Sequence, residues 1–420
     1  MGTFRYTILI ILFFINNVFS TSKEEIALRI NEILKVLPPS THAAILIINP
    51  LTQDTVFSLN PTNSMIPASN TKLFTTATAL SELGGDFVLK TSLLTEDNNL
   101  TDGIINGNLY IKGYGNSEFT KSDLEQCVQK LVQKGIRKIT GRIIGDDTYF
   151  DNVYTREDWI RDEVANVKLP PISALVIDRN REVVYKKRGR RSRRLRRYFV
   201  NVQNPPLNAA QLLRDELLHS GIEVASDAAA GTTPSGAIEL TNCSIILRNL
   251  LRDINKHSDN FLAECLFKTI GAETSEKQGN AFYSTQAILS FIKDNGIYSD
   301  GSSIVDGSGI SRYDQVTVGA LTGVLEKMYF DMIHFDDFYN SLSIAGVDGT
   351  LRHRMSGTTA ENNFHGKTGT LNGVSSISGY LKTASGDDLI ISMIFEFDKK
   401  GTRFHHSIQD DIITLLSDWQ

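Results

Sequence analysis

The sequence predicts an α/β (α+β) protein in which one domain is inserted into another. Helical and strand patterns of hydrophobic residues follow one another along most of the 420-residue chain. Between residues 87 and 234 the pattern changes to short strands and turns around one amphipathic helix. We therefore expect a discontinuous first domain, residues 21–86 and 235–420, and an inserted α+β domain, residues 87–234. About 400 residues suffice for two or three domains with ample core.

The segment before the expected insertion predicts a helix, a β-hairpin and a second helix. Apolar residues recur at helical spacing over residues 24–37, and Pro38 and Pro39 end this helix. Residues 43–48 and 55–59 predict the two strands of the hairpin. The second helix follows Pro67 and stops at Gly84.

The segment after the expected insertion predicts further helices and two adjacent strands. Helical patterns cover residues 243–270, 279–293, 316–329 and 407–419. Residues 374–382 and 389–397 alternate as strands of one sheet.

The first 20 residues have the pattern of a cleaved secretory signal peptide. Arg5 precedes an apolar stretch, residues 6–15, and compact residues, Val18 and Ser20, stand at the positions that a signal peptidase reads. A bilayer-spanning helix needs about 20 apolar residues, so this stretch is short for one. We expect a periplasmic or secreted protein, with an uncleaved N-terminal anchor as the alternative.

The net charge of −5 hides a basic segment. Residues 186–197 contain nine of the 43 lysines and arginines and no acidic residue. Such a run could contact an anionic wall polymer or a membrane surface. The alternative is a solvated, mobile loop. Nucleic-acid binding is not expected in a secreted protein without an accompanying binding fold.

The three cysteines argue against a disulfide framework or a zinc site, because their number is odd and their spacings are unrelated. Cys127 and Cys265 lie in amphipathic helical patterns, which is typical of core residues. No His-Glu-x-x-His pattern or paired His/Cys cluster occurs in the sequence, and we expect neither a metal nor another cofactor.

Ser69 and Lys72 are the first candidates for catalytic residues. Their spacing of three places both side chains on one face of the second helix. A lysine on a buried face loses solvation, which favours its neutral form and allows it to accept the proton of a serine hydroxyl. Taken alone, the pair could equally be a helix-capping serine and a surface lysine.

Two further motifs support a catalytic role for Ser69 and Lys72. Ser258-Asp259-Asn260 and Lys367-Thr368-Gly369 follow in the order that serine penicillin-recognising enzymes use. With residues 255–264, 306–312, 345–351 and 367–371, the chain resembles the D-alanyl-D-alanine carboxypeptidase/endopeptidases, the class C low-molecular-mass penicillin-binding proteins. The resemblance implies a penicillin-binding/β-lactamase-like catalytic domain, and the long separation of Ser69 from Ser258 agrees with an insertion.

The resemblance also implies a role for each motif. Ser69 would attack the carbonyl of the penultimate D-Ala and Lys72 would take its proton. Ser258 would relay a proton to the leaving nitrogen, and Asn260 would hydrogen-bond the substrate backbone. Lys367 would attract the terminal carboxylate.

The residues that follow Lys367 would bind the substrate. The Thr368 hydroxyl would add a hydrogen bond to the terminal carboxylate, and Gly369 would leave room for substrate along the strand edge. Thr370 would contribute a backbone N–H to the oxyanion hole, together with the N–H of Ser69. Asp259 is expected to orient a loop, and His257 to be structural.

A carboxylate after Trp159 is the candidate for reading the side-chain amine of the peptidoglycan stem, again by resemblance. Asp162 is the first candidate and Glu163 the second, with a simple surface carboxylate as the alternative. The β-rich third module usual in the family appears deleted, because the basic segment leads directly to residues 202–206.

The function implied is that of a serine-type D-Ala-D-Ala carboxypeptidase, with endopeptidase activity as a further option. Its substrates would be peptidoglycan stem peptides, and β-lactams would be covalent inhibitors. A β-lactamase and a non-catalytic wall-binding protein are the alternatives. The sequence leaves open the oligomeric state, the third stem residue and the balance between the two peptidase activities.

Overall fold

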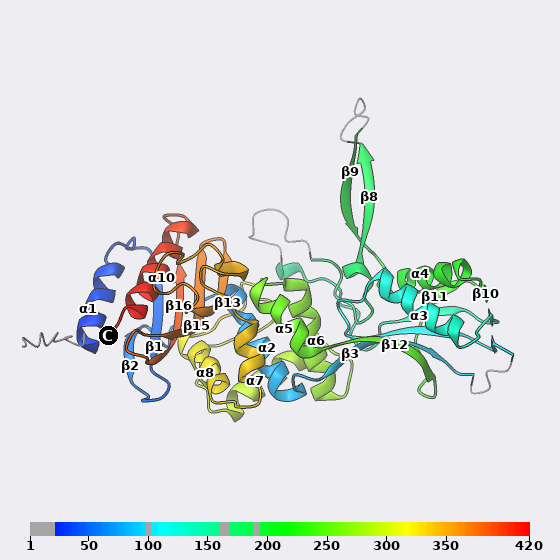
Figure 1. Ribbon diagram of the computed structural model, residues 1–420, viewed down its shortest axis with the longest axis horizontal. Helices are drawn as coiled ribbons and strands as arrows, with labels where there is room; N and C mark the ends of the chain where they lie inside the picture. The colour runs from blue at the N-terminus through cyan, green and yellow to red at the C-terminus, as the bar shows by residue number, and fades with distance from the viewer. Residues whose placement is uncertain (1–21, 98–101, 160–168, 188–193) are drawn as a thin grey trace, which may run out of the picture.

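The computed structural model describes residues 22–97, 102–159, 169–187 and 194–420 (Figure 1). The molecule is elongated, with two packed units side by side and a long hairpin projecting between them. The expected signal peptide lies outside the described residues. Among those residues, no helix has the length and apolar character needed to cross a membrane.

The first unit is built on a six-stranded antiparallel sheet of order β13-β14-β15-β16-β1-β2. Its strands are β1 (His42–Ile48), β2 (Thr55–Leu59), β13 (Ser343–Ile344), β14 (His365–Leu371), β15 (Val374–Lys382) and β16 (Asp388–Glu396). The predicted hairpin of β1 and β2 is confirmed, as is the pairing of β15 with β16.

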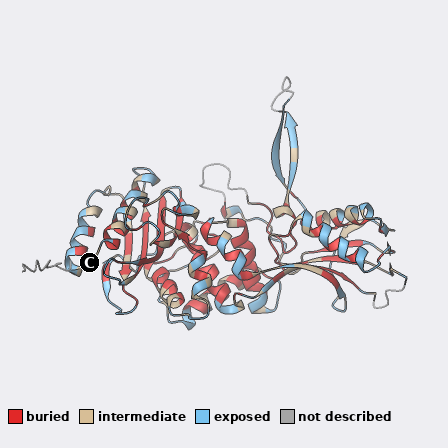
Figure 2. Ribbon diagram, viewed as in Figure 1, coloured by how far each residue is buried: buried red, intermediate tan, exposed pale blue. Residues whose placement is uncertain are grey.

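Helices cover both faces of this sheet (Figure 2). Helices α1 (Lys23–Leu34) and α10 (Thr402–Ser417) pack on one face. The other face packs against α8 (Val318–Tyr329). The same hydrophobic core contains α2 (Thr71–Leu83), α5 (Leu247–Lys256), α6 (Asn260–Ser275), α7 (Ala281–Asp294) and α9 (Phe335–Ser341). In β16, Ile391 belongs to the core that contains α1 and α10, and the adjacent Ile390 belongs to the core on the other face. Successive side chains of a strand alternate between its two faces in this way. The two cores hold the sheet, and with it β14, in place.

The second unit contains a mixed five-stranded sheet of order β11-β7-β5-β3-β12. Its strands are β3 (Val88–Thr95), β5 (Leu109–Tyr114), β7 (Ile143–Asp146), β11 (Ala228–Ala230) and β12 (Ile238–Ile246). Helices α3 (Lys121–Gln133) and α4 (Pro205–His219) share its core. Three short strands, β4 (Ile104–Ile105), β6 (Lys138–Ile139) and β10 (Glu223–Val224), form a small parallel sheet beside it.

The prediction of continuous helical structure over residues 243–270 is wrong at the start of this range and in its middle. Cys243 to Ile246 belong to β12, which pairs with β3 of the second unit. The helical structure is then interrupted between Lys256 and Asn260, so that the second motif lies in a turn between α5 and α6. The domain boundary at residue 234 stays a prediction, and the pairing of β12 favours a return to the first unit after residue 246.

The basic segment is not simply a loop. Strand β8 (Arg181–Lys187) and strand β9 (Leu195–Asn201) form an antiparallel hairpin, so Lys186, Lys187 and residues 195–197 lie on paired strands. Residues 188–193 lie outside the described part of the chain. The hairpin projects away from both units (Figure 1).

All three cysteines are free thiols. Cys127 and Cys265 are buried, as expected of core residues. Cys127 on α3 lies next to Cys243 on β12, with 3.4 Å between the two sulfur atoms. Burial raises the pKa of the Cys127 thiol, and its contact with Cys243 adds to the effect.

Candidate active site

Ser69 and Lys72 meet at the junction of a short 3-10 turn, η1 (Ala68–Asn70), and α2. Ser69 therefore lies in the turn just before α2, and Lys72 lies in the first turn of that helix. The Lys72 Nζ donates a hydrogen bond to the Ser69 Oγ at 3.0 Å. Lys72 is fully buried, so the alternative of a surface lysine is wrong.

The surroundings of Lys72 favour a neutral amine more than an ordinary lysine site does. Burial lowers the Lys72 pKa to about 8, against an opposing effect from nearby carboxylates, of which Asp306 is the strongest and Glu264 the next. Its Nζ also donates to the Asn260 Oδ1 at 2.7 Å and to the Ser308 carbonyl oxygen at 2.5 Å. These two acceptors fix the direction of the amine beside the serine.

The turn between α5 and α6 brings Ser258 and Asn260 to the same place. Ser258 has a left-handed backbone conformation, with φ of 54°, which is uncommon for a residue other than glycine. Asp259 caps α6 by accepting a hydrogen bond from the Leu262 N–H at 3.0 Å, and it forms an ion pair with Arg179. Asp259 thus orients the turn. The Oδ1 of Asn260 serves Lys72, which leaves its amide N–H groups for a substrate.

The third motif lies on β14, next to the nucleophile. The Lys367 Nζ donates to the Ser258 Oγ at 2.9 Å and to the Thr368 carbonyl oxygen at 2.7 Å. Burial lowers the Lys367 pKa well below its usual range, and the charge of Lys72 adds to this. A substrate carboxylate would oppose both effects. Because β13 pairs with β14 only at His365 and Gly366, the outer edge of β14 beyond these residues is open to a substrate.

The structure adds a steric reason for a glycine at position 369. A Cβ atom at Gly369 would lie 2.2 Å from the Ser376 Oγ, 2.7 Å from the Pro67 carbonyl oxygen and 2.9 Å from the Ser69 nitrogen. The glycine therefore makes room for the backbone of the nucleophile turn, and its expected role in leaving room for a substrate stays a prediction. This close approach also brings the backbone of Ser69 to the strand that carries Thr370, as a shared oxyanion hole requires.

We predict that Gly369→Ala slows acylation by penicillin at least about tenfold, because the new methyl group pushes β14 away from the backbone around Ser69. The measurement is the rate of covalent labelling by a fluorescent penicillin. Gly236→Ala is the matched control, since a Cβ there meets nothing within 4 Å. Labelling of Gly369→Ala at the wild-type rate would contradict this role.

A loop that received no role from the sequence supports Lys72. The Asp306 carboxylate accepts backbone N–H groups from Ser308 at 3.1 Å, Gly309 at 2.6 Å and Ser311 at 2.8 Å. It also accepts the Trp159 Nε1–H at 3.1 Å. The buried Asp306 side chain thereby fixes the loop that presents the Ser308 carbonyl to Lys72. The run Asp-Gly-Ser-Gly in the sequence was the available signal.

Two other residues were also missed. The Thr350 Oγ1 accepts a hydrogen bond from the Thr368 Oγ1 at 2.7 Å and so orients that hydroxyl. The buried Glu264 accepts the Gly307 N–H at 3.0 Å. Burial raises the pKa of Glu264 to about 8, and the charge of Asp306 adds to this. Both residues lie in stretches that carry the family resemblance, 255–264 and 345–351, but the sequence alone does not join Thr350 to Thr368 or Glu264 to Gly307.

The candidate for reading the stem peptide is not tested. Asp162 and Glu163 lie outside the described residues, and Asp162 stays a prediction. The described segment ends at Trp159, in the 3-10 turn η2 (Glu157–Trp159), and the side chain of Trp159 bonds to Asp306. The neighbouring Asp158 accepts a hydrogen bond from Ser311 at 2.7 Å. This described segment thus ends at Trp159, beside the loop that supports Lys72.

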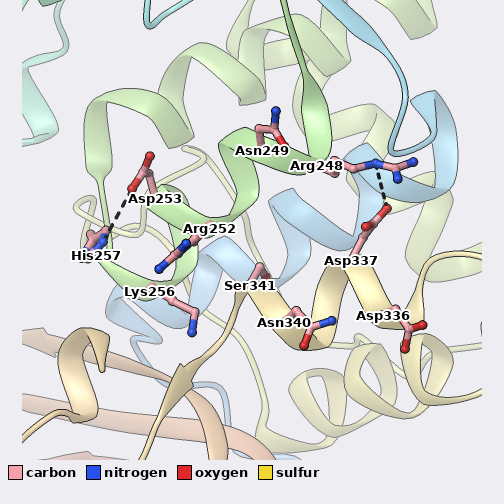
Figure 3. Close-up of a pocket in the computed structure, with 10 residues that line it drawn as sticks. All are labelled: Arg248, Asn249, Arg252, Asp253, Lys256, His257, Asp336, Asp337, Asn340 and Ser341. Atoms are coloured by element: carbon pink, nitrogen blue, oxygen red, sulfur yellow. Dashed lines mark ion pairs between the residues drawn. The ribbon is translucent and has the colours of Figure 1, made fainter. Parts of the chain in front are cut away.

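His257 belongs to a separate pocket and not to the Ser69 site (Figure 3). This cavity, about 770 Å³, lies between α5 and α9, with His257 at one end. His257 is largely exposed and lies 3.7 Å from Asp253. The pocket lining is Arg248, Asn249, Arg252, Asp253, Lys256, His257, Asp336, Asp337, Asn340 and Ser341. None of these residues contributes an atom to the Ser69–Lys72 pair.

The arrangement defines a class of protein. A half-buried serine receives a hydrogen bond from a lysine of lowered pKa, and a second serine–lysine pair stands beside it. These are the groups that a serine enzyme uses to transfer an acyl group through a covalent intermediate.

The comparisons with known proteins identify the family. The model of the D-Ala-D-Ala carboxypeptidase 3 (S13) family matches residues 27–191 and 186–417. The chain belongs to this family. It is 24% identical to the D-alanyl-D-alanine carboxypeptidase DacB of Haemophilus influenzae, over 86% of each chain. It is 25% identical to a D-alanyl-D-alanine carboxypeptidase of Actinomadura, over 82% of this chain and 76% of the relative.

Solved structures show the same fold. Penicillin binding protein 4 (dacB) from Haemophilus influenzae superposes with a TM-score of 0.81 at 22% identity, over 93% of this chain and 99% of that one. A predatory endopeptidase from Bdellovibrio bacteriovorus, solved with its immunity protein, gives a TM-score of 0.54 at 15% identity, over 90% and 95%. The predicted α/β fold of the penicillin-binding type is therefore confirmed.

Proposed function

We propose that this protein is a serine-type D-Ala-D-Ala carboxypeptidase that cleaves peptidoglycan stem peptides through an acyl-enzyme on Ser69. The observation that carries the proposal is the 3.0 Å contact between the Ser69 hydroxyl and a Lys72 amine whose pKa is lowered to about 8. Family membership supplies the substrate class. Endopeptidase activity on cross-linked stems uses the same steps.

The reaction begins with attack on the peptide. The Ser69 Oγ adds to the carbonyl carbon of the penultimate D-Ala while its proton passes to the Lys72 Nζ. The backbone N–H groups of Ser69 and Thr370 stabilise the negative charge that develops on the carbonyl oxygen. Asn260 donates to the substrate backbone and keeps the reacting carbonyl in line.

Ser258 and Lys367, the second serine–lysine pair, protonate and hold the leaving group. The Ser258 hydroxyl gives its proton to the nitrogen of the terminal D-Ala as the C–N bond breaks. The proton that Lys72 took from Ser69 then replaces it, so Lys72 is neutral again before deacylation. Lys367 holds the terminal carboxylate, and the Thr368 hydroxyl donates to it after turning away from Thr350, its acceptor in the free enzyme. Water then adds to the ester carbonyl of the acyl-enzyme, loses a proton to Lys72, and releases the shortened stem with Ser69 restored.

A β-lactamase activity is the less favoured alternative. Rapid hydrolysis of a penicilloyl ester needs a positioned carboxylate that can activate water. Of the carboxylates near Lys72, Asp306 is occupied by four N–H donors, and burial holds Glu264 at a pKa of about 8. The four hydrogen bonds to Asp306 and the raised pKa of Glu264 leave neither group free to activate water. We therefore expect β-lactams to act as lasting covalent inhibitors.

A two-substrate assay tests the proposal. A synthetic N-acyl-L-Lys-D-Ala-D-Ala peptide should release many equivalents of D-alanine per enzyme. A chromogenic cephalosporin should react with about one equivalent and then stop. Many turnovers of the cephalosporin without release of D-alanine would overturn the proposal in favour of a β-lactamase. Binding to isolated cell walls without either reaction would indicate a wall-binding protein.

The domain assignment and the location complete the proposal. Residues 21–86 and 235–420 would form the catalytic domain and residues 87–234 the inserted domain, with the basic segment 186–197 as a contact to anionic wall polymer or membrane. The signal peptide would place the enzyme in the periplasm or outside the cell, where its substrate is. The intact set of Ser69, Lys72, Ser258 and Lys367 argues against a role in binding alone.

A further inference from the structure

The hairpin of β8 and β9 is exposed along most of its length (Figure 2), and several of its exposed residues are apolar. Its six strongly exposed apolar residues are Val183, Tyr185, Leu195, Tyr198, Phe199 and Val200, with 41 to 63% of their surface accessible. An isolated two-stranded hairpin is only marginally stable in water, because it buries little apolar surface. This composition indicates that the hairpin packs against something outside the described residues.

The cross-strand register sorts these side chains into two faces. Val183 stands opposite Phe199, Tyr185 opposite Arg197, and Lys187 opposite Leu195. Directly opposed residues in an antiparallel pair lie on the same face. The face that contains these pairs, which we call the aromatic face, carries Val183, Tyr185, Leu195 and Phe199 together with Arg181, Lys187 and Arg197. The opposite face carries Val184, Tyr198 and Val200 with Glu182, Lys186 and Arg196.

The positive charge of the hairpin favours an anionic partner. Its described end holds Lys186, Lys187, Arg194, Arg196 and Arg197, whereas its one described carboxylate, Glu182, lies near the base. The Arg197 guanidinium lies 4.7 Å from the centre of the Phe199 ring, so cation and aromatic ring are interleaved. A dissolved polyanion would satisfy the charge but would leave the apolar side chains in water. An anionic bilayer surface pairs with the cationic side chains and also removes the apolar side chains from water.

The base of the hairpin ties it firmly to the active site. Asp178, Arg179 and Asn180 form the turn η3 (Asp178–Asn180) and all have left-handed backbone conformations. The Asn180 side chain holds this turn by donating to the Pro171 carbonyl oxygen at 3.0 Å. Arg179 pairs with Asp259 of the second motif. The hairpin thus projects from a fixed point next to the catalytic turn.

We propose that the hairpin of β8 and β9 is a membrane-docking element that places its aromatic face in the headgroup region of an anionic lipid bilayer. Seven-residue strands span roughly 23 Å. Docking would therefore hold the catalytic unit close to the membrane, and the enzyme would act on the wall layer nearest to it. This proposal does not depend on the reaction assigned to Ser69.

Co-sedimentation of the full-length protein with lipid vesicles tests the proposal. The probes are vesicles of phosphatidylcholine with 30% phosphatidylglycerol and vesicles of phosphatidylcholine alone. We expect binding to the anionic vesicles at least about tenfold tighter than to the neutral ones, with binding that weakens as salt is added. Equal binding to both, or to neither, would overturn the proposal, even if the protein sediments with isolated cell walls.

A matched pair of double variants separates insertion from simple charge attraction. Tyr185→Ser with Phe199→Ser removes two side chains of the aromatic face, and Tyr198→Ser with Val200→Ser removes two from the opposite face. Neither pair changes the charge. We expect the first pair to weaken binding to anionic vesicles at least about tenfold and the second less than threefold. Equal binding by both variants and wild type would show that charge alone acts, and would contradict insertion.

Two readouts keep this comparison interpretable. Penicillin labelling of both double variants should match wild type, which shows that the catalytic unit is folded. In addition, Phe199→Trp should show a blue shift of its fluorescence on anionic vesicles, and Tyr198→Trp should show less. An equal shift at both positions, or none at position 199, would overturn the assignment of the inserted face.

Discussion

Replacing Ser69 with alanine should abolish covalent labelling by penicillin and release of D-alanine. The loss should be at least about a thousandfold, because the hydroxyl is the atom that forms the acyl bond and the remaining groups offer no substitute nucleophile. The fold should persist, since Ser69 is only partly buried and the contact it loses is the hydrogen bond from Lys72. The measurement is gel fluorescence after reaction with a fluorescent penicillin.

A nearby serine provides the control for this variant. Ser64 precedes the nucleophile turn, and its hydroxyl donates to the Gly301 carbonyl oxygen at 2.6 Å, away from Lys72. Ser64→Ala should label at a rate close to wild type. If a folded Ser69→Ala protein labels as well as Ser64→Ala, Ser69 is not the nucleophile.

Replacing Lys72 with arginine should lower the acylation rate at least about a hundredfold. A guanidinium group keeps the positive charge but stays protonated at neutral pH, so it cannot accept the Ser69 proton. Because Lys72 is fully buried, the larger side chain could also disturb packing. Lys72→Met supplies the second variant, since it has similar length without a charge or a basic nitrogen. Both variants should be inactive for the same reason.

The pH dependence of acylation gives an independent check on Lys72. The neutral amine is the reactive form, and its share rises with pH through the lowered pKa of about 8. The acylation rate of wild type should therefore rise about tenfold per pH unit below 8 and level off above it. A rate within threefold of wild type for either Lys72 variant, or a flat wild-type profile from pH 5 to 8, would show that another group is the base.

The sequence predicted the motif residues well because their chemistry is local. The spacing of Ser69 and Lys72 is a property of one helical stretch, and the hairpin of β1 and β2 follows from alternation and a turn. The relation of Lys72 to Ser308, and of Thr368 to Thr350, could not be predicted, because each contact joins segments brought together only by tertiary packing.

Two wrong expectations have the same physical origin. Residues 243–246 fit the start of a helical pattern, but pairing with β3 outweighs this local preference. A solvated loop was one of the two interpretations of the basic segment, whereas runs of β-branched and aromatic residues on either side of its centre form β8 and β9. Gly369 shows a third limit, since the close approach of the Ser69 backbone is visible only in three dimensions.

The most direct test of the central claim is to locate the covalent adduct on the wild-type protein. After reaction with penicillin, proteolysis and mass spectrometry should find one penicilloyl group, on the peptide that contains Ser69, and fragmentation should place it on that residue. An adduct on Ser258 or on any other residue, or a folded protein that forms no adduct, would contradict the account.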